Sequence, residues 1–418
     1  MPSWQSLYYE HPIAIVSGQG CEVVDAEGNR YLDLFGGILT TMTGHAVPEI
    51  VDAVRDQVAK IAHTSTLYLS EPLVALAERI ACLSNIPDAR VFFTTSGTEA
   101  NDAALLMATS YRRSNQVLAL RNSYHGRSFS TMAVTGNRSW SASSLSGLAV
   151  SFVHGGYRLR SPFRHLGDDD YTAACVQDLR DVIDMTTSGD VACMIAEPIQ
   201  GVGGFATPPD GFFGEMKKTL DEHGIVFIAD EVQTGWGRTG DHFWGYEAHG
   251  MVPDVLTFAK GIANGLPLAG VVARADIMDA VGANSISTFG GNPVAVAAAA
   301  ANLDHLLDND LQGNARRVGA HMKARLEAAA ARHAWIAEVR GRGLMLAVEA
   351  VQPGGLVPDA PAAAEVLEAA RRQGVLLGKG GLYGNVVRIS PPLSISVSEA
   401  DRGLDAIEAA FDHVSGSR

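Results

Sequence analysis

The stretch Asp254-Val-Leu-Thr-Phe-Ala-Lys260-Gly-Ile-Ala-Asn-Gly-Leu-Pro-Leu-Ala-Gly270 leads from a short apolar run to one lysine and then to a turn-rich segment. The run 255–259 predicts a buried strand that ends next to Lys260. Only six of the 32 lysines and arginines are lysines. Burial disfavours the charged form of an amine, and a neutral amine can attack a carbonyl carbon to form a Schiff base. Taken alone, the stretch favours a simpler alternative, a lysine that extends from the strand end to water.

A mostly parallel α/β sheet is the fold class that the middle of the chain predicts. From residue 90 to 300, short β-rich runs alternate with helical segments, as in a sheet flanked by helices. The expected strands are apolar runs, namely Val91–Phe93, Val117–Arg121, Cys193–Glu197, Ile225–Ala229, Val255–Ala259 and Ala269–Ala273. Segments 48–62 and 71–83 show helical spacing of apolar residues. The segment 142–172 is the least patterned and is expected to be a long surface excursion.

The 418 residues are expected to form a large domain over 56–300 and a smaller α+β domain over 301–418. Residues 1–55 open with a hairpin-like pair of runs and are expected to join the small domain. The β-like runs of the tail follow a helix-rich stretch, and they are Ile336–Arg340, Leu344–Glu349, Val375–Leu377 and Val386–Ile389. A final helix is expected over 398–413.

Charge and composition argue against several classes of partner. The formal net charge is −14 and no basic run exceeds two residues, which disfavours nucleic acid and anionic membranes. The N-terminus lacks the cationic and apolar regions of a secretion signal, and no apolar window is long enough to span a bilayer. No cysteine lies in a metal-binding spacing, so reduced thiols and no metal site are expected at Cys21, Cys82, Cys175 and Cys193. We expect a soluble, cytoplasmic protein.

Two strand ends carry candidate ligand-binding groups. Ser96-Gly97-Thr98-Glu99 follows a predicted strand and opens a helix, where free backbone N–H groups favour an anion such as phosphate. A simple N-cap explains the same residues equally well. Asp230 ends a strongly apolar strand, the edge at which open α/β sheets bind ligands. A buried carboxylate needs a cationic partner, either a protonated heteroaromatic nitrogen or Arg238.

Further candidates lie in other turns and in the tail. Tyr124 and His125 follow another predicted strand, although packing and a helix cap explain them as well. Thr288 lies in a glycine-rich turn. Arg388 lies between β-branched residues of a predicted strand and must find an anion, either a protein carboxylate or a substrate carboxylate. The glycine-rich stretches 201–204 and 340–343 do not complete GxGxxG between a strand and a helix, so neither predicts dinucleotide binding.

Together these parts resemble the class III aminotransferases, pyridoxal phosphate enzymes of fold type I. The resemblance extends from Gly28-Asn-Arg-Tyr-Leu-Asp33 to Pro391-Pro392-Leu393. Its most specific stretches occur in the family's order, and they are Ser96-Gly-Thr-Glu-Ala-Asn101, Glu197-Pro-Ile-Gln-Gly201, Ala229-Asp-Glu-Val-Gln-Thr-Gly235 and Ala259-Lys-Gly-Ile262. The implied fold is a large cofactor-binding domain with a smaller α+β domain, and the implied cofactor is pyridoxal 5′-phosphate.

The resemblance also implies roles for the residues around the cofactor ring. Lys260 would form the internal aldimine and, once freed, would move the proton between Cα and C4′. Asp230 would keep the pyridine nitrogen protonated, so that the ring accepts electrons. Tyr124 would stack on one face of the ring and Val232 would press on the other. Gln233 would hydrogen-bond the phenolic oxygen.

A second group of implied residues concerns the phosphate and the assembly. Gly97 and Thr98 would donate to the phosphate, and the resemblance places Ser96 and His125 at the cofactor as well. Thr288 would reach the phosphate of a neighbouring subunit, because the family's active sites lie at a dimer interface. A homodimer with shared active sites is therefore implied, and tetramers occur in the family.

Within the family, the chain is similar to the alanine–glyoxylate and 3-aminoisobutyrate–pyruvate subgroup. Ornithine- and 4-aminobutyrate-type members carry a glutamate, the partner of the strand arginine, where this chain has Val202. Arg388 would then stay free to bind a substrate carboxylate. The subgroup is matched also at 63–66, 242–245, 288–293 and 376–379, whereas 138–171 departs from it.

The leading hypothesis is transfer of an amino group from a small amino acid such as alanine to glyoxylate or pyruvate. An ω-amino acid or amine transaminase is the main alternative, and a racemase, aminomutase or decarboxylase would use the same machinery. A binding protein without activity would be expected to lack Lys260 or Asp230, and both are present. A nicotinamide dehydrogenase would need the GxGxxG fingerprint that the chain lacks.

Overall fold

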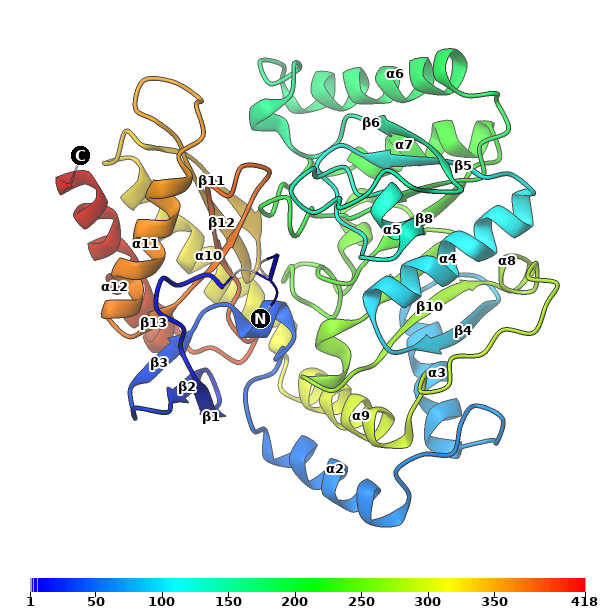
Figure 1. Cartoon of the computed structure of the whole chain (residues 1–418), viewed down its shortest axis with the longest axis horizontal. Helices are drawn as coiled ribbons and strands as arrows, with labels where there is room; N and C mark the ends of the chain where they lie inside the picture. The colour runs from blue at the N-terminus through cyan, green and yellow to red at the C-terminus, as the bar shows by residue number, and fades with distance from the viewer. Residues whose placement is uncertain (1, 3, 6, 418) are drawn as a thin grey trace.

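A seven-stranded sheet forms the centre of the larger lobe of the computed structural model, which describes residues 2, 4, 5 and 7–417 (Figure 1). Its spatial order is β4-β10-β9-β8-β7-β5-β6. The strands are β4 Ala89–Thr94, β5 Gln116–Leu120, β6 Ala149–Val153, β7 Cys193–Ala196, β8 Val226–Asp230, β9 Val255–Phe258 and β10 Ala269–Arg274. Each strand expected in this region is present, and the predicted α/β class is confirmed.

Strand β10 is the one whose direction differs within this sheet. Strands β5 to β9 pair in parallel, whereas β10 is antiparallel to both β4 and β9. The connection 259–268 between β9 and β10 holds only the 3₁₀ helix η3 Lys260–Ala263. It is too short for the helical crossover that parallel neighbours need. The parallel pairing of β8 and β9 places Asp230 and Lys260 at the same carboxyl edge of the sheet.

Helices cover both faces of the sheet, as the alternation of its buried residues requires. Val117 and Ala119 of β5 belong to the core cluster that includes α4 (Gly97–Arg112), whereas Leu118 and Leu120 face the cluster of α6 and α7. The helices of this lobe are α2 Pro48–Lys60, α3 Glu71–Leu83, α4, α5 Phe129–Ala133, α6 Asp168–Thr186, α7 Phe212–Glu222, η2 Gly245–His249, α8 Ala275–Met278 and α9 Pro293–Asp308.

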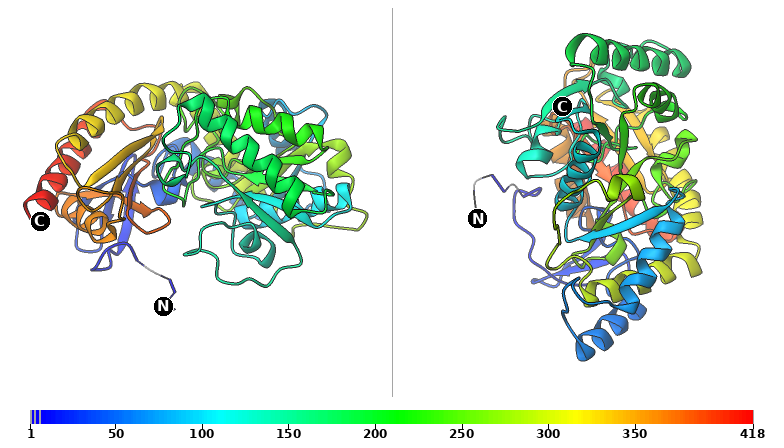
Figure 2. Two further views of the ribbon diagram at one scale, coloured as in Figure 1. Left: turned by 90° about the horizontal axis from the view of Figure 1, so that it is seen from above. Right: turned by 90° about the vertical axis from the view of Figure 1, so that its right-hand side faces the viewer.

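Two smaller sheets and three long helices build the second lobe, which lies beside the first (Figure 2). One sheet has the order β1-β2-β3-β13 and so joins the two ends of the chain; the other has the order β11-β12-β15-β14. The strands are β1 Ile15–Gln19, β2 Glu22–Asp25, β3 Arg30–Asp33, β11 Ile336–Arg342, β12 Met345–Ala350, β13 Val375–Leu376, β14 Gly378–Gly380 and β15 Val386–Ile389. The helices are α1 Gly36–Leu39, α10 Leu311–Ala330, α11 Ala360–Arg372 and α12 Val397–Gly416.

The segment 142–172 is more ordered than the expected surface excursion. It contains the edge strand β6, the 3₁₀ helix η1 Arg158–Arg160 and the first turn of α6. β6 is only five residues long and largely half-buried, so it lacks the continuous apolar run that marks a central strand. The three aspartates 168–170 open α6, where acidic side chains are favoured by the helix dipole.

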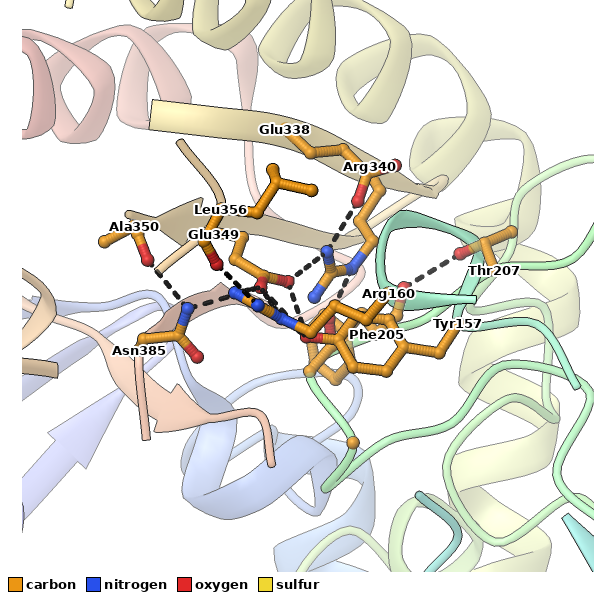
Figure 3. A network of polar contacts seen from close by, with 12 residues as sticks. Tyr157, Arg160, Phe205, Thr207, Glu338, Arg340, Glu349, Ala350, Leu356 and Asn385 are labelled. Atoms are coloured by element: carbon orange, nitrogen blue, oxygen red, sulfur yellow. Dashed lines mark hydrogen bonds and ion pairs between the residues drawn. The ribbon is translucent and has the colours of Figure 1, made fainter. Parts of the chain in front are cut away.

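A buried ionic network ties this segment to the second lobe (Figure 3). The carboxylate of Glu349 accepts hydrogen bonds from Arg340 at 2.7 Å and Arg160 at 2.8 Å. The Tyr157 hydroxyl donates to the same carboxylate at 2.9 Å, and the Asn385 side chain does so at 3.2 Å. Two arginines and two neutral donors therefore compensate one fully buried charge.

Two general features of the described residues concern membranes and metals. Within them, no helix is both long and apolar enough to cross a membrane. In the same part of the chain, no three or more His, Cys, Asp or Glu side chains are grouped so that they could hold a metal ion.

Candidate active site

Lys260 lies directly after β9 in a backbone conformation that is rare for a lysine. Its φ is 46°, in the left-handed region that non-glycine residues seldom adopt. Burial lowers the pKa of Lys260 to about 8, against the opposite effect of the Asp230 and Glu197 carboxylates. Among the described residues, its amine makes no hydrogen bond or ion pair with another side chain. The amine is therefore available for chemistry near neutral pH.

Asp230 ends β8 and is held by neutral and histidine donors rather than by an arginine. Its Oδ2 accepts from Asn101 Nδ2 at 2.8 Å and pairs with His125 Nδ1 at 2.7 Å. Arg238 instead donates to the backbone carbonyls of Leu344 and Pro391. The alternative in which Arg238 balances the Asp230 charge is therefore not realised.

The start of α4 provides unoccupied donors next to this carboxylate. Ser96 caps the helix, and its hydroxyl accepts from the backbone N–H of Glu99 at 3.2 Å. Within the described residues, the backbone N–H groups of Gly97 and Thr98 have no acceptor, as is usual for the first turn of a helix. A Cβ on Gly97 would lie 3.1 Å from a methyl carbon of Val232, so glycine keeps this approach open.

Tyr124 and Gln233 come from loops that follow β5 and β8. The Tyr124 ring contacts Trp140 edge-on, with centroids 5.4 Å apart, and burial raises the pKa of its hydroxyl. The side-chain oxygen of Gln233 is buried and has no hydrogen-bond partner in the described part of the chain. A buried amide oxygen left without a donor is costly, which indicates that a ligand supplies one.

Glu197 connects the two sides of the site, although the sequence analysis did not single it out. One carboxylate oxygen accepts from the Tyr124 backbone N–H at 2.9 Å, and the other accepts from Gly201 at 2.8 Å. Burial raises the pKa of Glu197 to about 7. Asn101 was quoted only as part of a longer stretch, and its contact with Asp230 depends on how α4 packs on the sheet.

Arg388 lies in β15 of the second lobe and is 2% exposed. Its guanidinium donates to the carbonyl of Lys379 at 2.9 and 3.1 Å, and to the carbonyl of Gly201 at 3.3 Å. Within the described residues, no carboxylate forms an ion pair with it. Its positive charge reaches Lys260, whose pKa it helps to lower. A buried cation without a counter-ion is the feature expected of a carboxylate-binding site.

Thr288 is exposed and lies in loop 279–292. Its neighbour Ser287 donates to the Glu99 side chain at 2.6 Å, which places the loop beside the start of α4. The predicted contact of Thr288 with a neighbouring subunit stays a prediction.

The model of the family called aminotransferase class III matches residues 5–411. The chain belongs to this family. This class III aminotransferase is 41% identical to alanine–glyoxylate aminotransferase 2 homolog 2, mitochondrial, of Arabidopsis thaliana over 96% of the chain and 83% of that protein. It is 36% identical to a 5-aminovalerate aminotransferase of Pseudomonas putida, over 97% of the chain and 95% of that protein.

Solved structures agree with this membership. An amine transaminase from an uncultivated Pseudomonas species, solved in its pyridoxal phosphate-bound form, is 32% identical and superimposes with a TM-score of 0.93. The match covers 99% of this chain and 97% of that one. The aminotransferase therefore uses pyridoxal 5′-phosphate, and amino acids and keto acids are its substrates.

The residues of this aminotransferase fit the cofactor. The buried carboxylate of Asp230 suits the pyridine nitrogen of pyridoxal phosphate, and the amine of Lys260, with its lowered pKa, suits the aldehyde. The free N–H groups at the start of α4 suit the phosphate, and the unpartnered amide oxygen of Gln233 suits the phenolic hydroxyl group. Asp230 lies at the carboxyl end of β8, Lys260 directly follows β9, and α4 follows β4. The carboxyl ends of strands are where α/β folds bind ligands.

Proposed function

We propose that the enzyme transfers an amino group from a small amino acid, alanine above all, to glyoxylate or pyruvate. The buried Arg388, which has no carboxylate partner in the described part of the chain, supports this proposal most directly. It binds the carboxylate that both substrates carry. Val202 supports the same reading, because its side chain leaves Arg388 without an acidic competitor at this position.

Residues at the carboxyl edge of the sheet hold and orient the cofactor ring. Asp230 keeps its pyridine nitrogen protonated, and Gln233 hydrogen-bonds its phenolic oxygen. Tyr124 and Val232 hold its two faces. When bound, pyridoxal phosphate would supply an electron sink for the electron pair left on the substrate Cα. Lys260 Nζ would take up the proton from Cα and deliver it to C4′, which a lowered pKa makes possible near neutral pH.

The phosphate is bound at the start of α4. Gly97 and Thr98 donate their backbone N–H groups to it, and the Ser96 cap holds the first turn in place. His125 Nδ1 donates a hydrogen bond to Asp230 Oδ2 and so holds this carboxylate in place. In the homodimer that we propose, Thr288 reaches the phosphate of the neighbouring subunit. We place the enzyme in the cytoplasm.

An ω-amino acid or amine transaminase is the second candidate function. It is favoured by the similarity to the 5-aminovalerate aminotransferase and by 37% identity to the 4-aminobutyrate aminotransferase of Escherichia coli. In that case Arg388 binds the carboxylate of the acceptor only. The distance between amine and carboxylate in the donor separates the two candidates.

Single donors without an acceptor test this proposal. The cofactor-loaded enzyme is mixed with L-alanine, 4-aminobutyrate, 5-aminovalerate or propan-2-amine, and pyridoxamine phosphate and the released keto product are measured by chromatography. One equivalent of both with L-alanine supports the first candidate. Product with only the ω-amino acids or the amine supports the second candidate and contradicts the first.

A further inference from the structure

Among the described residues, one side chain shares a hydrogen bond with Arg388, and it comes from the N-terminal segment. The Tyr8 hydroxyl accepts from Arg388 Nη2 at 3.0 Å. The other acceptors around the guanidinium are backbone carbonyls, those of Lys379 and Gly201. Tyr8 is thus the only side chain, among the described residues, that shares a hydrogen bond with the proposed carboxylate-binding arginine.

The direction of this bond leaves the Tyr8 proton unused. A phenolic hydroxyl both donates and accepts, and here it accepts from the guanidinium. No acceptor for its own O–H proton is present in the part of the chain that the structure describes. A guanidinium and an adjacent free O–H together offer donors for the two oxygens of one carboxylate.

The surroundings of the pair are aromatic. Phe35 and Phe205 lie against the guanidinium, with ring centroids 4.9 and 5.5 Å from its central carbon. The Tyr8 ring packs on Phe35 with centroids 5.6 Å apart. These rings reduce the contact of the charge with water, so a hydrogen bond to a bound carboxylate is stronger there than in solution.

The segment that carries Tyr8 is fixed to the same part of the second lobe as Arg388. The Tyr9 hydroxyl donates to the carbonyl of Leu377 at 3.1 Å and accepts from the Leu377 N–H at 2.8 Å. Leu377 directly precedes β14, which pairs with β15 through Gly378 and Arg388. The position of Tyr8 is therefore set by the bonds of its neighbour Tyr9 to Leu377 as well as by its own bond to Arg388.

We propose that Tyr8 is a second substrate-binding residue, which donates its O–H to the carboxylate held by Arg388. It makes the enzyme prefer amino acids and keto acids over amines that lack a carboxylate. This inference rests on the proposed function, because it assigns Arg388 to the substrate carboxylate. It adds the contribution of the N-terminal segment to the specificity of that site.

The variant Tyr8→Phe tests this role, because it removes the hydroxyl and keeps the ring. We expect KM for L-alanine and pyruvate to rise about 10-fold, the effect of one hydrogen bond to a charged group. The kcat at saturation and the kcat/KM for propan-2-amine are expected to stay within about twofold of the parent values. Tyr383→Phe is the matched control, since Tyr383 is 51% exposed and its hydroxyl makes no contact with Arg388.

A binding measurement that needs no turnover accompanies the kinetics. Propionate, a carboxylate without an amine, is titrated into cofactor-loaded enzyme while the protein fluorescence is recorded. Tyr8→Phe is expected to weaken its Kd about 10-fold and Tyr383→Phe to leave it unchanged. An unchanged Kd in Tyr8→Phe, or an equal loss for propan-2-amine, overturns the role of Tyr8.

The variant Arg388→Ala separates this inference from the proposed function. If it loses propionate binding while Tyr8→Phe retains it, only the role of Tyr8 is wrong. If Arg388→Ala keeps the parent affinity for propionate, the carboxylate site itself is wrong, and the proposed function and the role of Tyr8 fall together.

Discussion

At the scale of single residues, the proposed chemistry depends on the balance of charges around one amine. Burial lowers the pKa of Lys260, and the carboxylates of Asp230 and Glu197 act in the opposite direction. The sequence offered Lys260 and Asp230 as candidates because they lie at the ends of apolar strands, and only the resemblance to the class III aminotransferases gave them roles. It could not identify Tyr8, because the contact with Arg388 joins residues 380 apart in the chain.

This balance predicts how the cofactor-free enzyme takes up pyridoxal phosphate. Only the neutral amine attacks the aldehyde, and its fraction rises with pH through the pKa. The initial uptake rate, followed by absorbance, is therefore expected to rise with a midpoint near pH 8. In Asp230→Asn the midpoint should move to lower pH, since the carboxylate that raises the pKa of Lys260 is gone. A midpoint above pH 10, or an upward shift in Asp230→Asn, would contradict this balance.

At the scale of elements, a serine caps the start of two helices that differ in their surroundings. Ser96 caps α4 and Ser396 caps α12, and each accepts from the backbone N–H of a glutamate three residues later at 3.2 Å. The first helix begins at the proposed phosphate site. The second lies in the other lobe.

This pair allows the contribution of α4 to phosphate binding to be measured. Ser96→Ala and Ser396→Ala are each expected to lower the free energy of unfolding of the cofactor-free enzyme by about 1 kcal/mol. Only Ser96→Ala is expected to raise the Kd for pyridoxal phosphate, by several-fold, because it loosens the turn whose N–H groups hold the phosphate. Equal Kd values in the two variants would argue against a phosphate site at α4.

The sequence predicted the central strands well and the edge of the sheet poorly. Strands β8 and β9 are buried on both faces and so carry continuous apolar runs. Strand β6 pairs with one neighbour only and its residues are half-buried, which leaves no comparable pattern. Strand β14 is three residues long and is defined by its partner β15 rather than by its own side chains.

At the scale of the whole molecule, Glu349 links the two lobes through the segment 154–161. Burial alone would raise the pKa of Glu349, but Arg340 and Arg160 hold it below its ordinary value. The stability that results is present above the ordinary pKa of 4.5 and is lost as the pH falls through the lower pKa of the folded state.

Replacement of this carboxylate is expected to be costly. Glu349→Gln removes the buried counter-ion that Arg340 and Arg160 share and leaves Arg340 only the partly exposed Glu338. About 3 to 5 kcal/mol of unfolding free energy should therefore be lost at pH 7, measured with urea. Glu338→Gln is the matched control, since Glu338 also pairs with Arg340 but its side chain is 33% exposed. Its cost is expected to stay below about 1 kcal/mol. Equal losses would show that burial of the pair is not decisive.

The sheet that contains both β3 and β13 has a consequence for synthesis of the chain on the ribosome. Strand β13 pairs in parallel with β3, and Tyr9 bonds to Leu377 across 368 residues. Residues 9–33 therefore leave the ribosome well before residues 375–377 can cover their native edge, while the seven-stranded sheet between them can already fold. Tyr8 and Arg388 can meet only after Arg388 has left the ribosome, so the nascent chain brings Asp230 and Lys260 together on the central sheet before it forms the Tyr8–Arg388 pair.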